Sequence, residues 1–152
     1  MTTVREMLRF KGSDVWSVPP TATVYDALRV MADKNIGAVL VVEAGRVVGI
    51  LSERDYARKV VLYGRSSKET AVGDIMTERV VYVRPEQNAE DCMAVMTDKH
   101  VRHLPVLDGE RLLGVISIGD VVKSIIADRE FTIEQLEQYI TGASYQTGAA
   151  GW

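Results

Sequence analysis

The chain contains the same segment twice, because residues 18–56 and 83–121 align at a constant offset of 65 without a gap. The identical pairs, named by their first member, are Val18, Pro20, Asp26, Val30, Met31, Asp33, Lys34, Val41, Arg46, Gly49, Ser52 and Asp55. Most other pairs exchange one apolar residue for another. A repeat that keeps its register this well indicates tandem duplication and predicts internal pseudo-two-fold symmetry. Grooves between the two units should then come in related pairs.

Length and composition predict one soluble globular module. The 152 residues are 47% hydrophobic, and two units of about 60 residues would each be marginal alone but could share a core. No apolar run approaches the roughly 18 residues of a membrane span. The N-terminal residues lack the apolar core of a secretory signal. The single cysteine, Cys92, fits a small core residue in a reducing cytoplasm.

The charge balance argues against electrostatic binding to nucleic acid or to an anionic membrane. The net charge is −3 and the isoelectric point is near 5.4, with basic residues scattered along the chain. We therefore expect neither a nucleic-acid partner nor a membrane partner.

Hydrophobic spacing predicts the order strand–helix–strand–strand–helix in each unit. Thr23 and Asn88 are placed to cap the first helices, which carry apolar residues at helical spacing. The expected strands are 15–18, 38–43 and 47–51 in the first unit and 80–83, 104–107 and 112–116 in the second. The second helix of each unit is expected near 53–63 and near 118–128. Continuous apolar strands beside helices indicate an α/β fold.

These elements give a division into four segments. We expect a first repeat with its N-terminal segment over 1–64, a polar linker over 65–71 and a second repeat over 72–128. The remaining segment, 129–152, is expected to hold one more helix near 132–140, capped by Thr132, and a frayed tail over 143–152.

The sharpest local pattern is Gly-apolar-apolar-Ser-x-x-Asp, which ends the third strand of each unit. It starts at Gly49 and Gly114 and ends at Asp55 and Asp120. In the structural interpretation, Ser caps the following helix and Asp lies in its first turn. In the functional interpretation, the helix N-terminus holds a phosphate, Asp accepts from the two hydroxyls of a ribose, and Gly lets the backbone approach a base. Both interpretations stay open at this point.

The doubled motif, together with Val-Arg-His-Leu-Pro-Val at 101–106 and Val-Gly-Asp-Ile-Met-Thr at 72–77, resembles a tandem pair of CBS domains, a Bateman module. The resemblance covers roughly residues 1–128 and is closest to the small stand-alone bacterial CBS-pair proteins. It implies two pseudo-symmetric β-α-β-β-α repeats packed sheet to sheet as one module. It also implies a disc-shaped homodimer and adenine-nucleotide binding in two clefts between the repeats.

The resemblance also assigns residues to each cleft. One would use Ser117 and Asp120 together with Lys11, Gly12, Val15, Gly37 and Ala38. The other would use Ser52, Arg54 and Asp55 together with Thr77, Val80, Arg102 and His103. Because Arg54, Arg58, Lys59 and Arg102 gather at the second cleft and Lys11 is the main cation of the first, we expect unequal affinities for phosphate. For Arg58 and Lys59, a solvated helix face is the alternative.

The sequence favours a regulatory module over an enzyme. His100 and His103 have no nucleophile at a recognisable spacing, so we expect no catalytic residue and a positional or packing role for both. Metal-ligand spacing, a Walker loop and a dinucleotide fingerprint are also missing. No prosthetic group is expected; the ligand would be AMP, ATP or NAD, with S-adenosylmethionine ranked behind them.

We expect ligand binding to shift the arrangement of repeats or protomers. The signal would reach a separate effector chain, whose identity the sequence does not give, or would be read through oligomerisation. Two other interpretations stay open. The chain could be a structural dimerisation module with empty clefts, or a nucleotide hydrolase.

Overall fold

The computed structural model describes residues 1–12 and 14–141, and its two halves form two small sheets flanked by helices. In the first half, β1 (Ser17–Val18) pairs parallel with β2 (Ala38–Glu43), which pairs antiparallel with β3 (Arg46–Ser52). In the second half, β4 (His103–Asp108) and β5 (Arg111–Ser117) form the equivalent antiparallel pair. The equivalent strands of the two repeats keep the offset of 65: β4 begins 65 residues after β2, and β5 begins 65 residues after β3. The predicted repeat is therefore confirmed.

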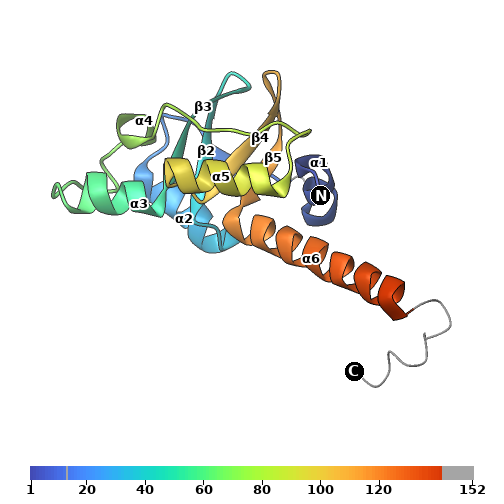
Figure 1. Cartoon of the computed structure of the whole chain (residues 1–152). Helices are drawn as coiled ribbons and strands as arrows, with labels where there is room; N and C mark the ends of the chain where they lie inside the picture. The colour runs from blue at the N-terminus through green and yellow to red at the C-terminus, as the bar shows by residue number, and fades with distance from the viewer. Residues whose placement is uncertain (13, 142–152) are drawn as a thin grey trace.

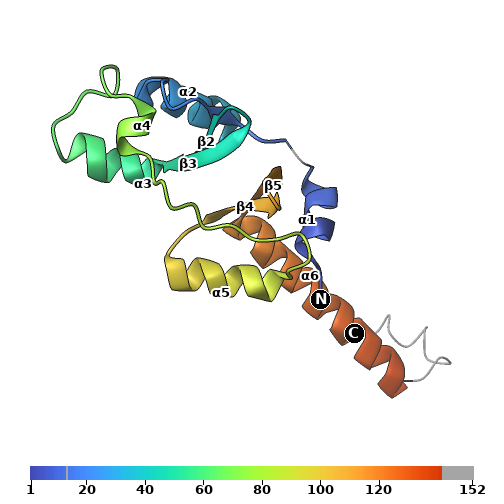
Figure 2. The same ribbon diagram turned by 90° about the horizontal axis from the view of Figure 1, so that it is seen from above.

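The helices lie outside the two sheets. Figure 2 shows α2 and α4 on one side of the pair of sheets and α5 and α6 on the other, with α1 beside β5. The helices are α1 (Val4–Lys11), α2 (Val24–Lys34), α3 (Glu53–Tyr56), the π-helix η1 (Ala57–Val61), α4 (Val72–Ile75), α5 (Ala89–Lys99) and α6 (Ile118–Thr141). The α/β class and the two repeats are therefore as predicted.

Each repeat has its own hydrophobic core, instead of the single shared core that small units led us to expect. One core is built around Val24, Val41 and Leu51, and the other around Leu104 and Ile116. Contacts between β3 and β5 join the two halves.

The short helix that leads each sequence unit packs into the core of the other unit. From α1, Val4, Met7 and Leu8 are buried in the second repeat's core. From α4, Val72 and Ile75 are buried in the first repeat's core. This exchange links the two marginal units, because neither core is complete without a helix from the other unit.

Matching backbone hydrogen bonds hold both exchanged helices. The amide of Val24 donates to Thr70 O at 2.9 Å, and the amide of Val72 donates to Ala22 O at 2.8 Å. In the other repeat, the amide of Ala89 donates to Thr2 O at 3.1 Å. Bridges between Thr3 and Asn88 and between Thr23 and Ala71 complete the pattern.

Helix capping follows the sequence. The amide of Asp26 donates to Thr23 Oγ1 at 3.1 Å, and the amide of Asp91 donates to Asn88 Oδ1 at 2.9 Å. Cys92 is fully buried, as expected of a core residue. Its burial, with a smaller contribution from Asp91, raises the pKa of the thiol to about 11.

Three sequence expectations were wrong in detail. The first strands are shorter than expected: β1 has two residues, and in the second repeat only Val83 bridges to Val106 within the described residues. The helix near 53–63 divides into α3 and the π-helix η1. The two helices expected near 118–128 and 132–140 are one continuous helix, α6 (Figure 1).

The continuity of α6 also changes the role of Thr132. Its hydroxyl donates to Asp128 O at 3.0 Å, one turn back, so it lies inside the helix and does not cap a new one. The expected tail over 143–152 lies outside the described residues.

Candidate functional site

A cavity of about 670 Å³ lies between the two repeats at the Asp55 motif. The first repeat contributes the start of β2, the end of β3 and the beginning of the following helix, and the second contributes the end of α5 and the start of β4. Its lining residues are Gly37, Ala38, Ile50, Ser52, Glu53, Arg54, Asp55, Arg58, Thr77, Arg79, Val81, Lys99, His100, Val101, Arg102 and His103. Its volume suits a small organic ligand.

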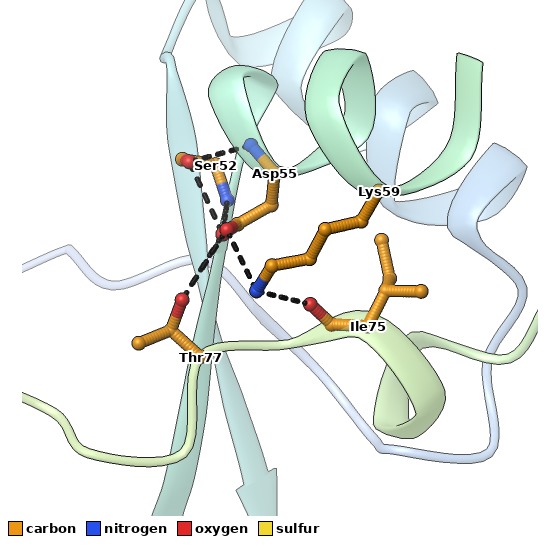
Figure 3. Close-up of polar contacts among 5 residues, drawn as sticks. All are labelled: Ser52, Asp55, Lys59, Ile75 and Thr77. Atoms are coloured by element: carbon orange, nitrogen blue, oxygen red, sulfur yellow. Dashed lines mark hydrogen bonds and ion pairs between the residues drawn. The ribbon is translucent and has the colours of Figure 1, made fainter. Parts of the chain in front are cut away.

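Asp55 is the most constrained acidic group in this cavity. Its side chain is 13% exposed, and Oδ2 accepts the Ser52 amide at 3.0 Å and the Ser52 hydroxyl at 3.1 Å (Figure 3). The Ser52 hydroxyl in turn accepts the Asp55 amide at 3.1 Å, which completes a capping box. Thr77 and Lys59 approach Oδ1 at 3.3 Å and 3.1 Å.

Lys59, in the π-helix, lies between Asp55 and the end of the exchanged helix α4. Its ammonium also donates to Ile75 O at 3.0 Å, so it joins the two units (Figure 3). Lys59 thus neutralises Asp55 from within the fold. The sequence left two roles open for Lys59, a place on a solvated helix face and a contact to phosphate. Its ion pair and hydrogen bond within the fold match neither role.

The cavity lining is cationic. Five basic side chains face two carboxylates, those of Glu53 and Asp55. The basic residues are Arg54, Arg58, Arg79, Lys99 and Arg102. Arg54 also donates from Nη1 to His100 O at 3.0 Å and so links the two repeats. This excess of positive charge favours an anionic ligand.

The glycines of the doubled motif serve packing and not the approach of a base. A Cβ at Gly49 would lie 2.5 Å from Met76 Sδ, and a Cβ at Gly114 would lie 2.7 Å from Leu8 Cδ2. Both glycines therefore make room for the exchanged segments. At the cavity, the close approach occurs at Gly37, where a Cβ would lie 3.2 Å from Glu53 Oε1 and 3.4 Å from His103 Cε1.

The second motif forms the same capping box and is closed by an ion pair. The Ser117 amide donates to Asp120 Oδ2 at 2.8 Å, and the Asp120 amide donates to Ser117 Oγ at 3.2 Å. Lys11, at the end of α1, donates to the same Oδ2 at 2.6 Å and to Val115 O at 2.8 Å. Burial alone would raise the pKa of Asp120, but the hydrogen bonds from Lys11 and Ser117 lower it overall.

His103 lies between the two motifs. It lines the Asp55 cavity, and its charge interacts with Lys11 and Asp120 of the other motif as well as with Glu53. The pKa of His103 is lowered, mainly by burial and further by the positive charges of Lys11 and Arg102. The negative charges of Asp120 and Glu53 oppose this shift. The imidazole is therefore kept neutral near neutral pH.

The structure brings most of the expected site residues together, and two residues of one expected set lie at the cavity of the other. Ser52, Arg54, Asp55, Thr77, Arg102 and His103 line the Asp55 cavity as grouped from the sequence. Gly37 and Ala38, assigned to the other cleft, line this cavity too. Val80 does not belong to the described lining; its neighbours Arg79 and Val81 do.

At the other motif, Lys11, Ser117 and Asp120 are in direct contact. Gly12 follows Lys11 as the C-cap of α1 with φ of 92°, which favours glycine. Val15 is half-buried on the segment that leads to β1.

Sequence reasoning missed two cations of the cavity, Arg79 and Lys99. Arg79 lies in an extended segment without hydrophobic periodicity, and Lys99 reads as an ordinary basic residue in the last turn of α5. A signal was available for Lys99, because it lies three residues before Arg102, which was assigned to the cleft together with His103.

Further findings concern metals and membranes. Within residues 1–12 and 14–141, no group of three or more His, Cys, Asp or Glu side chains is placed to hold a metal ion. No helix in this part of the chain is long and apolar enough to cross a membrane.

Comparison with known proteins gives one consistent family. The model of the CBS domain matches residues 4–62 and 72–127. The mitochondrial CBS domain-containing protein CBSX3 of Arabidopsis thaliana is 40% identical over an alignment of 151 residues, which covers 93% of this chain and 73% of that protein.

Solved structures agree with this match. A protein with CBS domains from Burkholderia ambifaria MC40-6 is 55% identical, with a TM-score of 0.80 over 84% of this chain and 96% of the other. The CBS domain pair of protein MJ0100 is 19% identical, with a TM-score of 0.74 over 84% of this chain and 98% of the other, and was solved in complex with 5′-methylthioadenosine and S-adenosyl-L-methionine. The duplicated sequence, the paired Ser-x-x-Asp caps and these matches show that the chain belongs to the CBS-domain family, with two CBS domains in tandem.

Proposed function

We propose that this chain is a non-catalytic regulatory module that binds an adenine nucleotide in the Asp55 cavity. The observation that carries the proposal is the combination, in one cavity between the repeats, of a held carboxylate and five basic side chains. A nucleotide presents the matching groups, two ribose hydroxyls and a phosphate chain.

Asp55 suits the ribose. Its two oxygens already accept four different donors, and a carboxylate offers about four acceptor positions in all. A ribose hydroxyl would replace the long contact from Thr77, at 3.3 Å and 3.5 Å, with little rearrangement. The capping box would meanwhile keep the carboxylate oriented.

The basic residues suit the phosphates. Arg58, Arg79 and Arg102 are exposed and line the cavity from both repeats, so a phosphate chain could draw them together. Arginine forks bind phosphate oxygens in pairs, which favours two or three phosphates over one. AMP, ATP and NAD therefore remain the candidates, and ligands with a longer phosphate chain should bind more tightly.

The Asp120 motif would be a second, weaker phosphate site. Its nearest cation, Lys11, is already paired with Asp120, so the local charge is balanced before any ligand arrives. A nucleoside with little phosphate charge fits this side better than ATP does. MJ0100, which shares the fold, is in complex with two adenosine-derived ligands of this kind.

Regulation would act through the links between the repeats. Arg54, Lys59 and Lys11 each join segments from different units at a motif, so a ligand that engages these side chains changes how the units are held. We expect the output through a homodimer and a separate effector chain. We keep a reducing cytoplasm as the expected compartment, although the relative CBSX3 is mitochondrial by name.

A thermal-shift panel tests the proposal with AMP, ADP, ATP, NAD, NADH and S-adenosylmethionine. A ligand present at about 100 times its dissociation constant should stabilise the fold by about 2.7 kcal/mol, which is easily visible. No shift with any adenine compound at millimolar concentration would remove the proposal. Turnover of ATP or NAD in the same samples would instead support the hydrolase interpretation.

The reciprocal capping boxes favour one alternative, a purely structural role for both Ser-x-x-Asp motifs. The discriminating variants are Asp55→Asn and Asp120→Asn. If both bind nucleotides like the wild type and only melt earlier, the carboxylates are helix caps and the chain is a structural dimerisation module.

A further inference from the structure

The elements around the Asp120 motif repeat those around the Asp55 cavity at the offset of 65. Val18 pairs parallel with Val41 in the first repeat, and Val83 bridges parallel to Val106 in the second. The helices α2 and α5, which precede the central strands, end at residues 34 and 99. Each residue that lines the Asp55 cavity therefore has an equivalent on the Asp120 side.

The two sides meet at the pseudo-two-fold axis. Gly37 and Ala38 are the equivalents of Arg102 and His103, and all four residues line the Asp55 cavity. The axis therefore runs between these two pairs. The charge of Asp120 acts on His103, so the second motif lies close to this border.

The equivalent positions lack the positive charge of the Asp55 cavity. That cavity has five basic and two acidic lining residues, whereas their equivalents comprise two basic and two acidic residues. Lys11 adds one cation to the Asp120 side, but its ammonium is paired with Asp120 at 2.6 Å. A phosphate chain would therefore find little free positive charge here. The largest change is the replacement of Arg54, Arg79 and Arg102 by Gly119, Asp14 and Gly37.

An aromatic face stands on this side instead. Trp16 is the equivalent of Val81, which lines the Asp55 cavity, and 41% of Trp16 is exposed. Lys34, the equivalent of the lining residue Lys99, holds its ammonium 4.2 Å from the centroid of a Trp16 ring. Because Val81 and Lys99 line one cavity, the repeat places the ring face under Lys34 at the equivalent surface of the Asp120 side.

An exposed indole face that holds a cation also accepts a nucleobase, because both contacts use the π-face of the ring. Stacking is the stronger of the two contacts at an exposed site, so a base can displace Lys34, whose flexible stem lets the ammonium move into water. Resting on the proposed function, we propose that Trp16 is the stacking platform for the base of an adenine nucleoside at the Asp120 motif, and that Lys34 covers this platform until the base displaces it. Trp16 then makes this site select a base and not a phosphate chain.

Tryptophan fluorescence tests the proposal in the Trp152→Phe chain, in which Trp16 is the one remaining tryptophan of the two in the sequence. Adenosine should quench Trp16 saturably and without shortening its fluorescence lifetime, as a stacked base does, whereas ribose should not. Because no phosphate takes part, raising the salt should change the dissociation constant of adenosine by less than about twofold.

Binding calorimetry with adenosine adds a variant of the platform. It is carried out in an Asp55→Asn background, which weakens the first cavity. Trp16→Leu keeps an apolar side chain but removes the π-face, and should weaken adenosine about tenfold. Circular dichroism checks that this variant folds.

Lys34→Met gives the opposite sign. Without the competing ammonium, adenosine should bind about threefold more tightly, an effect that a merely structural contact between Lys34 and Trp16 would not produce. The matched control is Lys68→Met, which removes an ammonium 4.9 Å from the centroid of the Tyr25 ring, away from both motifs, and should leave adenosine binding unchanged.

The proposal is overturned if adenosine binds saturably without quenching Trp16, or if Trp16→Leu and Lys34→Met both bind adenosine like the wild type. If ATP stabilises the wild type while adenosine leaves Trp16 unchanged, this proposal alone fails and the proposed function of the Asp55 cavity stands. If no adenine compound binds, both fail.

Discussion

Removing Arg79 and Arg102 should separate phosphate recognition from ribose recognition in the Asp55 cavity. Both side chains are exposed and line the cavity from segments outside the capping box. Arg54 is less suitable, because its hydrogen bond to His100 O joins the repeats, and its loss would also disturb the fold.

The magnitude follows from the exposure of these side chains. A hydrogen bond to a charged group contributes about 1.5–3 kcal/mol, and solvent screening moves exposed arginines toward the lower end. Each loss should therefore weaken ATP about tenfold, and the double variant Arg79→Ala with Arg102→Ala about 100-fold. Adenosine, which has no phosphate, should bind both proteins within about twofold of each other.

Titration calorimetry with adenosine, AMP and ATP measures this, at about 0.05 M and about 0.5 M salt. The affinity of the wild type for ATP should fall with added salt more steeply than that of the double variant. Arg29→Ala, an exposed substitution in α2 outside the cavity lining, is the matched control. Equal losses for adenosine and ATP would refute the charge argument, and would mean that these arginines shape the cavity or hold the base.

Three further experiments probe the fold and its charges. Gly114→Ala should destabilise by about 1–3 kcal/mol, because the new Cβ would overlap a leucine methyl of α1, whereas Gly119→Ala should be neutral or slightly stabilising; chemical denaturation compares them. Lys11→Met should reduce the pH dependence that arises from the lowered pKa of Asp120, and should leave the part that the hydrogen bonds from Ser117 contribute. In the wild type this stability is present above about pH 4 and is lost as the pH falls through the folded pKa, which melting curves at acid pH detect. The lowered pKa of His103 means that, as the pH falls, the unfolded chain binds a proton before the folded chain does, so the wild type loses stability below about pH 6.5. In His103→Gln the stability should therefore fall less steeply over this pH range.

The sequence was sufficient for features that depend on local chemistry. Continuous runs of apolar residues and the constant offset located β2 to β5 within one residue at each end, and the caps at Thr23 and Asn88 were correct. Such features depend on side chains within a few residues of one another, so a single sequence contains them.

Features set by tertiary packing were missed. The packing of α1 into the second repeat was not anticipated, although Thr3 followed by Val4, Met7 and Leu8 has the pattern of a capped amphipathic helix. That pattern cannot say which unit the helix covers. The burial of Gly49 against Met76 was likewise invisible, because the contact joins segments far apart in sequence.

The site was predicted in composition better than in arrangement. The two Ser-x-x-Asp motifs and the cationic character of the Asp55 side follow from the sequence and from the family resemblance. The placement of Gly37 and Ala38 beside Asp55, and the pairing of Lys11 with Asp120, depend on how the exchanged helices orient the two repeats.

The most direct test of nucleotide binding at the Asp55 cavity is a titration of the ¹⁵N-labelled chain with ATP, followed by amide chemical shifts. The account predicts that the first and largest shifts occur at Gly37, Ser52, Asp55 and Thr77, and that Asp55→Asn weakens the binding that they report. Absence of any saturable shift, or shifts confined to surfaces away from the cavity, would contradict it.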